Sequence, residues 1–385
     1  MLPAPGPDAL AHSQRVTEHI RAAIDARAGW IDFAHYMNLA LYAPGLGYYA
    51  AGATKFGAAG DFVTAPETSP LFGRTLALQI APLLQATQGE VLELGAGSGK
   101  LAVDVLLELE RRQALPARYA ILELSADLQA RQHHTIATHA PHLAERVIWL
   151  DTLPAAFTGV MLANEVLDAL PVHCIAWQDQ TILERGVAWD GSRFVWQSRE
   201  LNAGALWQAV RNLPVLGETH APYFSEVNLA APALIQALAA TLTRGAMIFI
   251  DYGFPRREYY HPQRHMGTLR AHYRHHALDD PFYLPGLCDL TAHVDFSAIA
   301  EAATQSGLQL AGYTSQAGFL INAGITDLLG RTSPDDAAAY LPQANALQRL
   351  ISPAEMGELF KVIAFTRGLD WPGAGFARGD RSHNL

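Results

Sequence analysis

The sequence contains few of the residues that mark secreted, membrane-spanning or nucleic-acid-binding proteins. Its 385 residues include two cysteines and three lysines, and its formal net charge is -10. Because no basic run interrupts this acidic balance, we expect no nucleic-acid partner. No run of about 18 apolar residues occurs, so we expect no membrane-spanning helix and no membrane partner. The cysteines, Cys174 and Cys288, form no C-x-x-C pair, which favours a reducing compartment over a disulfide framework.

A targeting signal is also missing from the first residues. The opening M-L-P-A-P-G-P-D has neither the charged region nor the hydrophobic core of a secretion signal. We therefore expect a cytoplasmic protein. Half of the residues are hydrophobic and 17% are charged, which is typical of a globular enzyme.

What the sequence does contain is a strand, a glycine turn and a helix at residues 90–100, E-V-L-E-L-G-A-G-S-G-K. The apolar run that ends at Leu94 is typical of a buried strand. Gly95, Gly97 and Gly99 then leave the turn without side chains. Bare backbone N–H groups at a helix N-terminus let a polar or anionic ligand approach closely. The alternative is a turn that only lets a helix pack on a sheet.

The spacing of the glycines separates two classes of ligand. The dinucleotide fingerprint G-x-G-x-x-G would need a glycine where Lys100 stands, so an NAD-linked oxidoreductase is the least favoured interpretation. The pattern E-x-G-x-G-x-G, which begins at Glu93, resembles the first motif of class I S-adenosylmethionine (SAM) methyltransferases. In those enzymes the loop packs against the methionine part of SAM.

Strands and helices alternate around this turn. Seven strands are expected, at 90–94, 118–123, 146–150, 159–163, 246–253, 308–313 and 359–366. Such alternation favours an α/β fold in which a parallel sheet carries helices on both faces. The carboxyl ends of parallel strands lie on one edge of the sheet, where these folds bind ligands.

Acidic residues stand at several of these strand ends. Glu123 ends the second strand, where a carboxylate can accept hydrogen bonds from both ribose hydroxyl groups of an adenosine. Asp151 ends the third strand, where SAM enzymes commonly hold the adenine amino group, although a lone Asp there is often only a turn residue. The segment 57–74 adds Asp61 and Glu67, and we expect it to be a lid over the ligand or, alternatively, a helix-capping loop.

The fourth strand leads into A-N-E-V-L-D-A-L-P, with Asn164, Glu165 and Asp168. If this segment is helical, the two carboxylates share a face. Together they could hold the planar fork of an arginine guanidinium. The alternative is a helix that these residues merely begin and cap.

Two segments interrupt the alternation. The pattern of residues 172–200 predicts strands with a hairpin turn at Asp190-Gly191. We expect this inserted segment to form a cover or the surface of a homodimer. Residues 254–290 show no regular period, and we expect a substrate lid there. No carboxylate or cysteine completes a ligand set with the histidines of this segment, so we expect no metal. These histidines are His272, His275 and His276.

Five motifs in this order resemble the MidA-like family of SAM-dependent class I methyltransferases of bacteria and mitochondria. They are G-D-F-V-T-A-P-E-T-S-P-L-F-G, E-L-G-A-G-S-G, A-N-E-V-L-D-A-L-P, I-D-Y-G and D-L-T-A-H-V-D-F. The resemblance implies a Rossmann-like seven-stranded sheet with an N-terminal helical extension and insertions after strands 4 and 5. It implies a helical and lid segment at 1–75, a core at 76–171 and 242–370, and an inserted hairpin with helices at 172–241.

The resemblance also implies a cofactor and a reaction. SAM would lie among Glu93, Leu94, the three glycines and Glu123, with Asp61 and Glu67 at the mouth of its site. Asn164, Glu165 and Asp168 would receive the acceptor. Mitochondrial members are associated with respiratory Complex I assembly through symmetric dimethylation of an arginine. A bacterial cytoplasmic member, as expected here, need not share that partner. A small-molecule N- or O-methyltransferase and a SAM-binding assembly factor without turnover are the alternatives.

Overall fold

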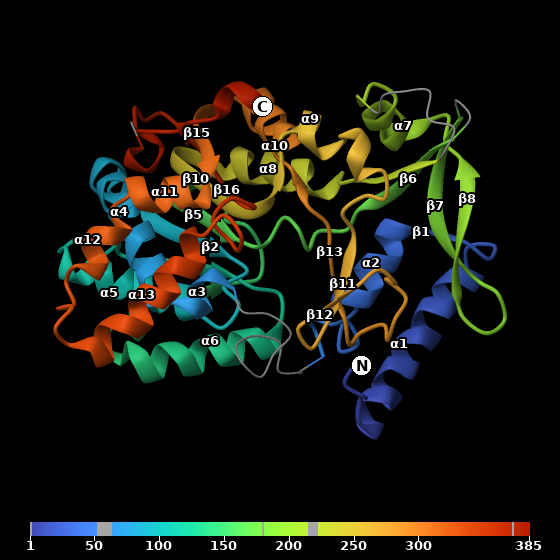
Figure 1. Cartoon of the computed structure of the whole chain (residues 1–385), viewed down its shortest axis with the longest axis horizontal. Coiled ribbons are helices and arrows are strands. Elements are labelled where there is room, and N and C mark those ends of the chain that lie inside the picture. The colour runs from blue at the N-terminus through green and yellow to red at the C-terminus, as the bar shows by residue number, and fades with distance from the viewer. Residues whose placement is uncertain (1, 52–63, 179–180, 215–221, 372) are drawn as a thin grey trace.

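The computed structural model describes residues 2–51, 64–178, 181–214, 222–371 and 373–385 (Figure 1). Its centre is a sheet in the order β15-β16-β10-β5-β2-β3-β4. These strands are β2 (Glu90–Leu94), β3 (Tyr119–Leu122), β4 (Val147–Leu150), β5 (Phe157–Asn164), β10 (Leu242–Phe254), β15 (Gln309–Ser315) and β16 (Phe360–Arg367). All seven expected strands are therefore present.

The sheet is mixed rather than wholly parallel. The pairs from β4 through β3, β2 and β5 to β10 are parallel, whereas β16 is antiparallel to both β10 and β15. An additional short strand, β14 (Val294–Asp295), pairs with the end of β10 and makes the sheet eight-stranded. The α/β class is confirmed, and the expected count of seven is exceeded by this two-residue strand.

Helices cover both faces of the sheet, and the strands supply residues to each. In β5, Val160 and Leu162 join one hydrophobic cluster while Met161 and Ala163 join the other. This alternation over a wholly apolar run is what a strand buried on both faces requires. The first face packs on α4 (Pro70–Thr87), α5 (Lys100–Arg111), α6 (Ala126–His139), α11 (Gln316–Asn322), α12 (Ile325–Leu329) and α13 (Ala337–Ile351). The second packs on α8 (Ala230–Thr241) and α10 (Phe296–Gln305).

A second sheet lies apart from the first, beside the N-terminal helices (Figure 1). It is antiparallel, and β7 pairs with β1, β6 and β8, while β9 pairs with β6. The expected hairpin at 190–191 is confirmed between β7 and β8. Its elements are β1 (Ile31–Asp32), β6 (His173–Gln178), β7 (Thr181–Trp189), β8 (Phe194–Glu200) and β9 (Tyr223–Val227), with α1 (Pro7–Asp25) and α2 (Phe33–Tyr42) packed on it.

Helix α1 begins at Pro7 with Gly6 as its N-cap residue, because proline suits the first turn of a helix, where no N–H partner is needed. Farther along the chain, α11 and α12 are two separate helices. Gly324 separates them at a φ of +96°.

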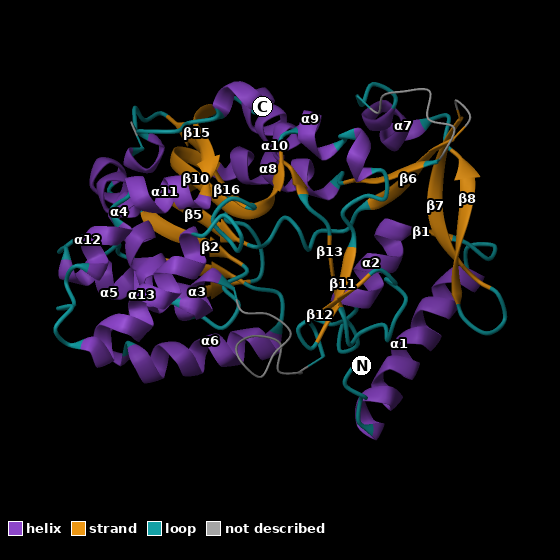
Figure 2. Ribbon diagram, viewed as in Figure 1, coloured by secondary structure: helices purple, strands orange, loops and turns teal. Residues whose placement is uncertain are grey.

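The segment 254–290 contains regular structure, so the expectation of an irregular loop is corrected. It holds α9 (Arg256–Tyr259), β11 (Arg270–Tyr273) and β12 (His276–Leu278), and β11 also pairs with β13 (Asp289–Thr291). Strands of three or four residues leave too short a period to detect, and the β11–β13 pair joins distant residues. Figure 2 shows this small sheet between the two larger ones.

The remaining helices are short. None of the helices in the described part of the chain combines the length and apolar character that crossing a bilayer requires. They are α3 (Ala65–Thr68), α7 (Gly204–Val210) and the 3-10 helices η1 (Pro141–Arg146), η2 (Pro262–Arg264), η3 (Ala374–Phe376) and η4 (Ser382–Asn384).

The close backbone packing of the central strands gives a stability prediction. Gly159 has a φ of +136°, and a Cβ there would lie 2.0 Å from the Glu90 carbonyl oxygen of β2. We expect Gly159→Ala to lower the free energy of unfolding by more than about 3 kcal/mol. Gly191→Ala is the matched control, because Gly191 has a φ of +103° with nothing within 4 Å. It should cost about 1 kcal/mol. Equal urea-unfolding midpoints for the two variants would refute the steric argument.

Candidate active site

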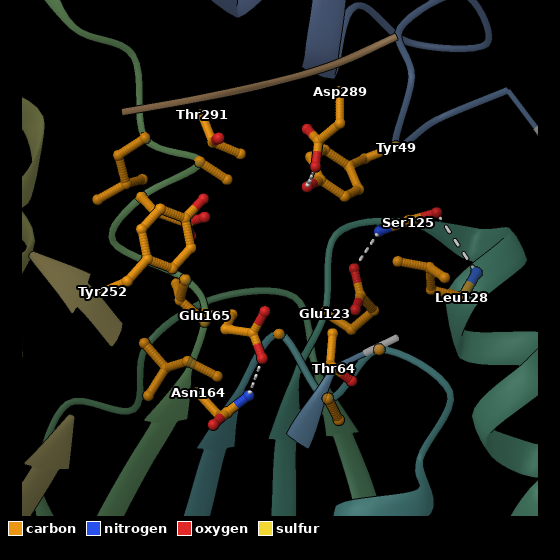
Figure 3. A pocket seen from close by; sticks show the side chains of 18 of the residues that line it. Tyr49, Thr64, Glu123, Ser125, Leu128, Asn164, Glu165, Tyr252, Asp289 and Thr291 are labelled. Carbon is orange, nitrogen blue, oxygen red and sulfur yellow. Dashed lines mark hydrogen bonds between the residues drawn. The ribbon is translucent and has the colours of Figure 1, made fainter. Parts of the chain in front are cut away.

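A cavity of about 760 Å³ opens at the carboxyl edge of the central sheet (Figure 3). Residues at the ends of β2, β3, β5 and β10 form its floor. Residues from α2 and from β11 and β13 also line it. This is the edge at which α/β folds bind ligands, and the volume suits a small molecule or cofactor.

The glycines of the turn have two different roles. Gly95 and Gly97 line the cavity at φ values of +60° and +54°, so the turn presents backbone to a ligand there. Gly99 is absent from the described lining. Its φ is +83°, and a Cβ would lie 3.0 Å from Cα of Gln132 in α6. The two interpretations of this turn, ligand site and helix packing, therefore apply to different glycines.

Glu93 lies just before this turn and lines the cavity with Leu94. Its side chain is 2% exposed, and the Tyr119 hydroxyl donates a hydrogen bond to Oε2 at 2.7 Å. Burial raises the pKa of Glu93 to about 7, although the Tyr119 hydrogen bond opposes the rise. The carboxyl group can therefore gain or lose a proton near neutral pH.

Glu123 reaches the cavity from the end of β3. The Ser125 backbone N–H donates to Oε1 at 2.9 Å (Figure 3). The Gln132 amide donates to Oε2 at 3.1 Å. These bonds orient the carboxylate and leave lone pairs for further donors such as ribose hydroxyls. Asp151 is exposed and outside the described lining, so its expected contact with adenine has no support from the cavity.

Of the two acidic residues expected in the lid segment 57–74, the structure describes Glu67 only. Glu67 lines the cavity, and its Oε1 accepts a hydrogen bond from the Ser98 hydroxyl of the glycine turn. Ser69 caps α4 as the capping interpretation expected, accepting from the Leu71 N–H at 3.2 Å. Asp61 lies outside the described residues.

The three residues expected at the acceptor end all line the cavity, but the segment is a turn and not a helix. Glu165 has a φ of +53°, a conformation that side chains other than glycine rarely adopt. Its Oε1 accepts from the Asn164 amide at 3.0 Å (Figure 3). Asp251, at the end of β10, holds the turn by accepting from the Leu167 N–H at 2.9 Å and the Asp168 N–H at 3.3 Å.

Burial controls the charge of this turn. It raises the pKa of Glu165 to about 8, and the neighbouring Asp168 adds to the rise. It also raises the pKa of Asp168 and of Asp251, where the charge of Asp168 contributes further. Among the described residues, no ion pair to arginine, lysine or histidine compensates Glu165 or Asp168.

Two acceptor atoms in this turn also lack donors. Asn164 Oδ1 and Asp168 Oδ1 are buried, and neither has a hydrogen-bond partner in the described part of the chain. Buried polar atoms in folded proteins are nearly always paired, and unpaired ones call for an explanation. A ligand with several N–H groups would satisfy both.

The structure adds side chains that the sequence interpretation missed. Tyr42 donates to the Ala169 carbonyl at 2.9 Å, and Tyr49 donates to Asp289 Oδ2 at 2.9 Å (Figure 3). Both tyrosines, together with Asp289 and Thr291, line the cavity. The motif D-L-T-A-H-V-D-F, which includes Asp289 and Thr291, could have indicated these two.

The histidines of 272–276 do not gather into a metal site. His275 and His276 are exposed, while His272 lines the cavity. Among the described residues, Asp32, His173 and Glu184 come close enough to hold an ion. The hydrogen bond of His173 to Glu184 at 2.8 Å, and that of Asp32 to the His35 N–H in the α2 cap, explain their positions without one.

Comparison with known proteins identifies the family. Residues 75–314 match the family described as "Putative S-adenosyl-L-methionine-dependent methyltransferase". The chain belongs to this family. It is a SAM-dependent methyltransferase.

The solved structures and curated relatives agree with this assignment. A crystal structure from Burkholderia thailandensis, "likely methyl transferase … bound to S-adenosyl-homocysteine", is 52% identical over 100% of both chains with a TM-score of 0.96. The Drosophila melanogaster mitochondrial protein arginine methyltransferase NDUFAF7 homolog is 30% identical, covering 92% of this chain and 85% of its own. The Homo sapiens mitochondrial protein arginine methyltransferase NDUFAF7 is 28% identical, covering 87% and 80%.

The residues of this methyltransferase fit its cofactor. Gly95 and Gly97 leave the turn open to a ligand, and Glu123 is oriented to accept hydroxyl groups. Glu93 and Glu67 place further carboxyl groups on the lining nearby. When bound, SAM supplies a methyl group on a cationic sulfur, and carboxyl groups on the lining would stabilise that positive charge electrostatically.

The glycine turn gives a binding prediction. Gly97→Val should weaken S-adenosylhomocysteine binding by more than about 100-fold, because a β-branched side chain is strained at a φ of +54° and Gly97 lines the cavity. Gly307→Val is the control. Gly307 has a φ of +78° and lies away from the described lining, so binding should be unchanged. Isothermal calorimetry measures both, and parental affinity in Gly97→Val would remove the turn from the site.

Burial of Glu93 gives a pH prediction. Its pKa is about 7 in the folded chain against an ordinary 4.5, so between these values the unfolded chain has lost the proton that the folded chain keeps. Stability then falls as pH rises through this window. Glu93→Gln removes this loss, and its stability relative to the parent should rise by up to about 3 kcal/mol from pH 4.5 to pH 7. Urea unfolding across this range measures the difference, and a pH-independent difference would contradict the assignment.

Proposed function

We propose that this methyltransferase methylates an arginine side chain of a protein. The proposal rests on the turn at residues 164–168, which we call the acceptor turn. Glu165 and Asp168 are buried there without a described cationic partner, and two oxygens of the turn have no described hydrogen-bond donor. An arginine guanidinium supplies both missing features, a positive charge and five N–H donors. The names of the curated relatives, which are protein arginine methyltransferases, support the same acceptor.

The turn residues would each act on the guanidinium. Glu165 and Asp168 would accept N–H bonds in the planar geometry that arginine favours. Asn164 would accept a further one at its unpaired Oδ1. A bound cation lowers the pKa of neighbouring carboxyl groups, so binding would ionise Glu165. Holding one nitrogen in place toward the donor methyl is the main source of rate in such a transfer.

The units of the chain would divide the work. We propose that the core at 76–171 and 242–370 holds the donor, while the segments 1–75 and 172–241 guide the acceptor protein. The family resemblance suggests a subunit of a respiratory complex as that protein.

Labelling of lysate proteins tests the proposal. The protein is incubated with isotope-labelled SAM and a lysate, and labelled peptides are sequenced by mass spectrometry. We expect label on arginine. Label on small molecules only, or on another residue type, would refute the arginine assignment while leaving the methyltransferase assignment intact.

Substitution of Glu165 gives a sharper outcome. Glu165→Gln should bind S-adenosylhomocysteine like the parent and lose at least about 100-fold in kcat, because the carboxylate can no longer offset the charge or take a proton. Glu145→Gln, on the exposed surface, is the control and should turn over normally. Full turnover by Glu165→Gln would remove Glu165 from the mechanism.

The parent should also show a pH dependence that the variant lacks. Glu165 acts ionised, and its pKa is about 8 before the acceptor binds. We therefore expect kcat/KM to rise with pH up to about pH 8 in the parent, since this parameter reports the free enzyme. A Glu165→Gln profile that keeps the same rise would assign it to another group.

A further inference from the structure

Helix α6 carries a fully buried polar side chain in the middle of its apolar stripe. Leu128, Gln132 and Ile136 recur every four residues and form the buried face of this helix. Gln132 is 0% exposed, and an amide without hydrogen-bond partners would be costly at such a position. A glutamine between two buried apolar residues therefore calls for an explanation from its contacts.

Both the nitrogen and the oxygen of the Gln132 amide have partners. Nε2 donates to the Gly97 carbonyl and to Glu123 Oε2, each at 3.1 Å. Oε1 accepts from the Trp149 indole N–H at 2.9 Å. Gly97 and Glu123 line the cavity, whereas Gln132 lies outside the described lining. One buried side chain thus contacts two separate parts of the cavity wall, the glycine turn after β2 and the acid at the end of β3.

The three partners determine which way the amide points. The Gly97 carbonyl and the Glu123 carboxylate accept hydrogen bonds, whereas the indole of Trp149 can only donate. Turning the amide over would place its oxygen against two acceptors and its nitrogen against a donor. Trp149 is itself stacked on His133 of α6, with ring centroids 3.6 Å apart. It therefore keeps the N–H groups of Gln132 directed toward the cavity wall.

The close approach of α6 to the glycine turn makes these contacts possible. A Cβ at Gly99 would lie 3.0 Å from Cα of Gln132, so the absence of a side chain at Gly99 lets the helix approach. The N-cap residue of α6 is Ser125, whose backbone N–H binds Glu123 Oε1 at 2.9 Å (Figure 3). Each carboxylate oxygen of Glu123 therefore accepts a hydrogen bond from α6 or from its cap.

We propose that Gln132 is a positioning residue for the cofactor, which holds the glycine turn and the Glu123 carboxylate in the relative geometry that SAM requires. A ligand that spans both parts binds more tightly when neither has to be ordered on binding. Strand β4 then serves the site through Trp149 and not through the exposed Asp151. The proposal rests on the glycine turn and Glu123 both contacting the donor, and it is independent of the acceptor.

Packing of α6 on the sheet is the competing explanation, because Gln132 also belongs to the buried face of the helix. Gln132→Leu keeps a side chain of similar size and removes the hydrogen bonds to Gly97, Glu123 and Trp149. Gln316→Leu is the matched control. Gln316 is also 0% exposed, donates to a backbone carbonyl at 2.9 Å, and lies away from the described lining.

Calorimetric titration with S-adenosylhomocysteine is the first measurement. Gln132→Leu should weaken binding by about 10-fold or more, because the Gly97 carbonyl and Glu123 Oε2 lose a buried donor. Trp149→Phe, a milder variant that keeps an aromatic ring, should weaken binding by about threefold. Gln316→Leu should lower stability and leave the affinity unchanged. Parental affinity in Gln132→Leu would overturn the proposal.

A double-mutant cycle then asks whether Gln132 acts through Glu123. Glu123→Gln is combined with Gln132→Leu, and the affinity for S-adenosylhomocysteine is measured for the parent, both single variants and the double variant. The loss caused by Gln132→Leu should shrink to about threefold or less in the Glu123→Gln background, because residues that act together are not additive. A role in packing alone predicts equal losses in both backgrounds, and that result would contradict the proposal.

A pH profile gives a readout that packing alone does not produce. In Gln132→Glu the introduced carboxyl group can donate to Glu123 Oε2 only while it is protonated, and the neighbouring carboxylate favours the protonated form. The affinity of this variant relative to the parent should therefore be highest near about pH 6 and fall by about fivefold or more toward about pH 8.5. Measuring the parent at each pH accounts for the other titrating groups. A pH-independent ratio would show that the hydrogen bond to Glu123 does not matter for binding.

Discussion

The burial of carboxyl groups without described cationic partners is the constraint on which the site depends. An unpaired charge costs several kcal/mol in a protein interior, so such groups hold their protons more strongly. Glu93 and Glu165 respond in this way, with pKa values of about 7 and about 8. Both groups would ionise when a positive ligand arrives, and in the proposed function these ligands are the donor sulfur and the acceptor guanidinium.

The surrounding structure maintains this costly arrangement. Glu165 is held at a positive φ, a strain of about 1–3 kcal/mol, while Asp251 accepts the backbone N–H groups of the same turn. The central strands are buried on both faces, and this packing fixes the positions at which β5 and β10 end. The small sheet of β11–β13 then closes the cavity with polar side chains of matched register. Stability in the core thus supports strain at the site.

The sequence predicts the parts that depend on local pattern. The glycine turn, the seven strands of the core and the positions of Glu93 and Glu123 follow from apolar runs and glycine spacing, and the structure places these two acids on the cavity. The parts it misses depend on contacts between distant residues. The strands β1, β9 and β13 form by pairing with strands distant in the chain, and the exposure of Asp151 depends on where its turn points. That Gly97 lines the cavity while Gly99 packs closely on α6 likewise depends on the position of α6.

The central claim is that the acceptor turn receives a cation and ionises as it does so. Calorimetric titration of the S-adenosylhomocysteine-loaded protein with Nα-acetylarginine amide at pH 7, in buffers of different ionisation enthalpy, counts the protons released on binding. The account predicts a release approaching one proton per bound arginine, because Glu165 is mostly protonated beforehand at a pKa of about 8, and no release in Glu165→Gln. Binding without proton release, or equal release in the variant, would contradict it.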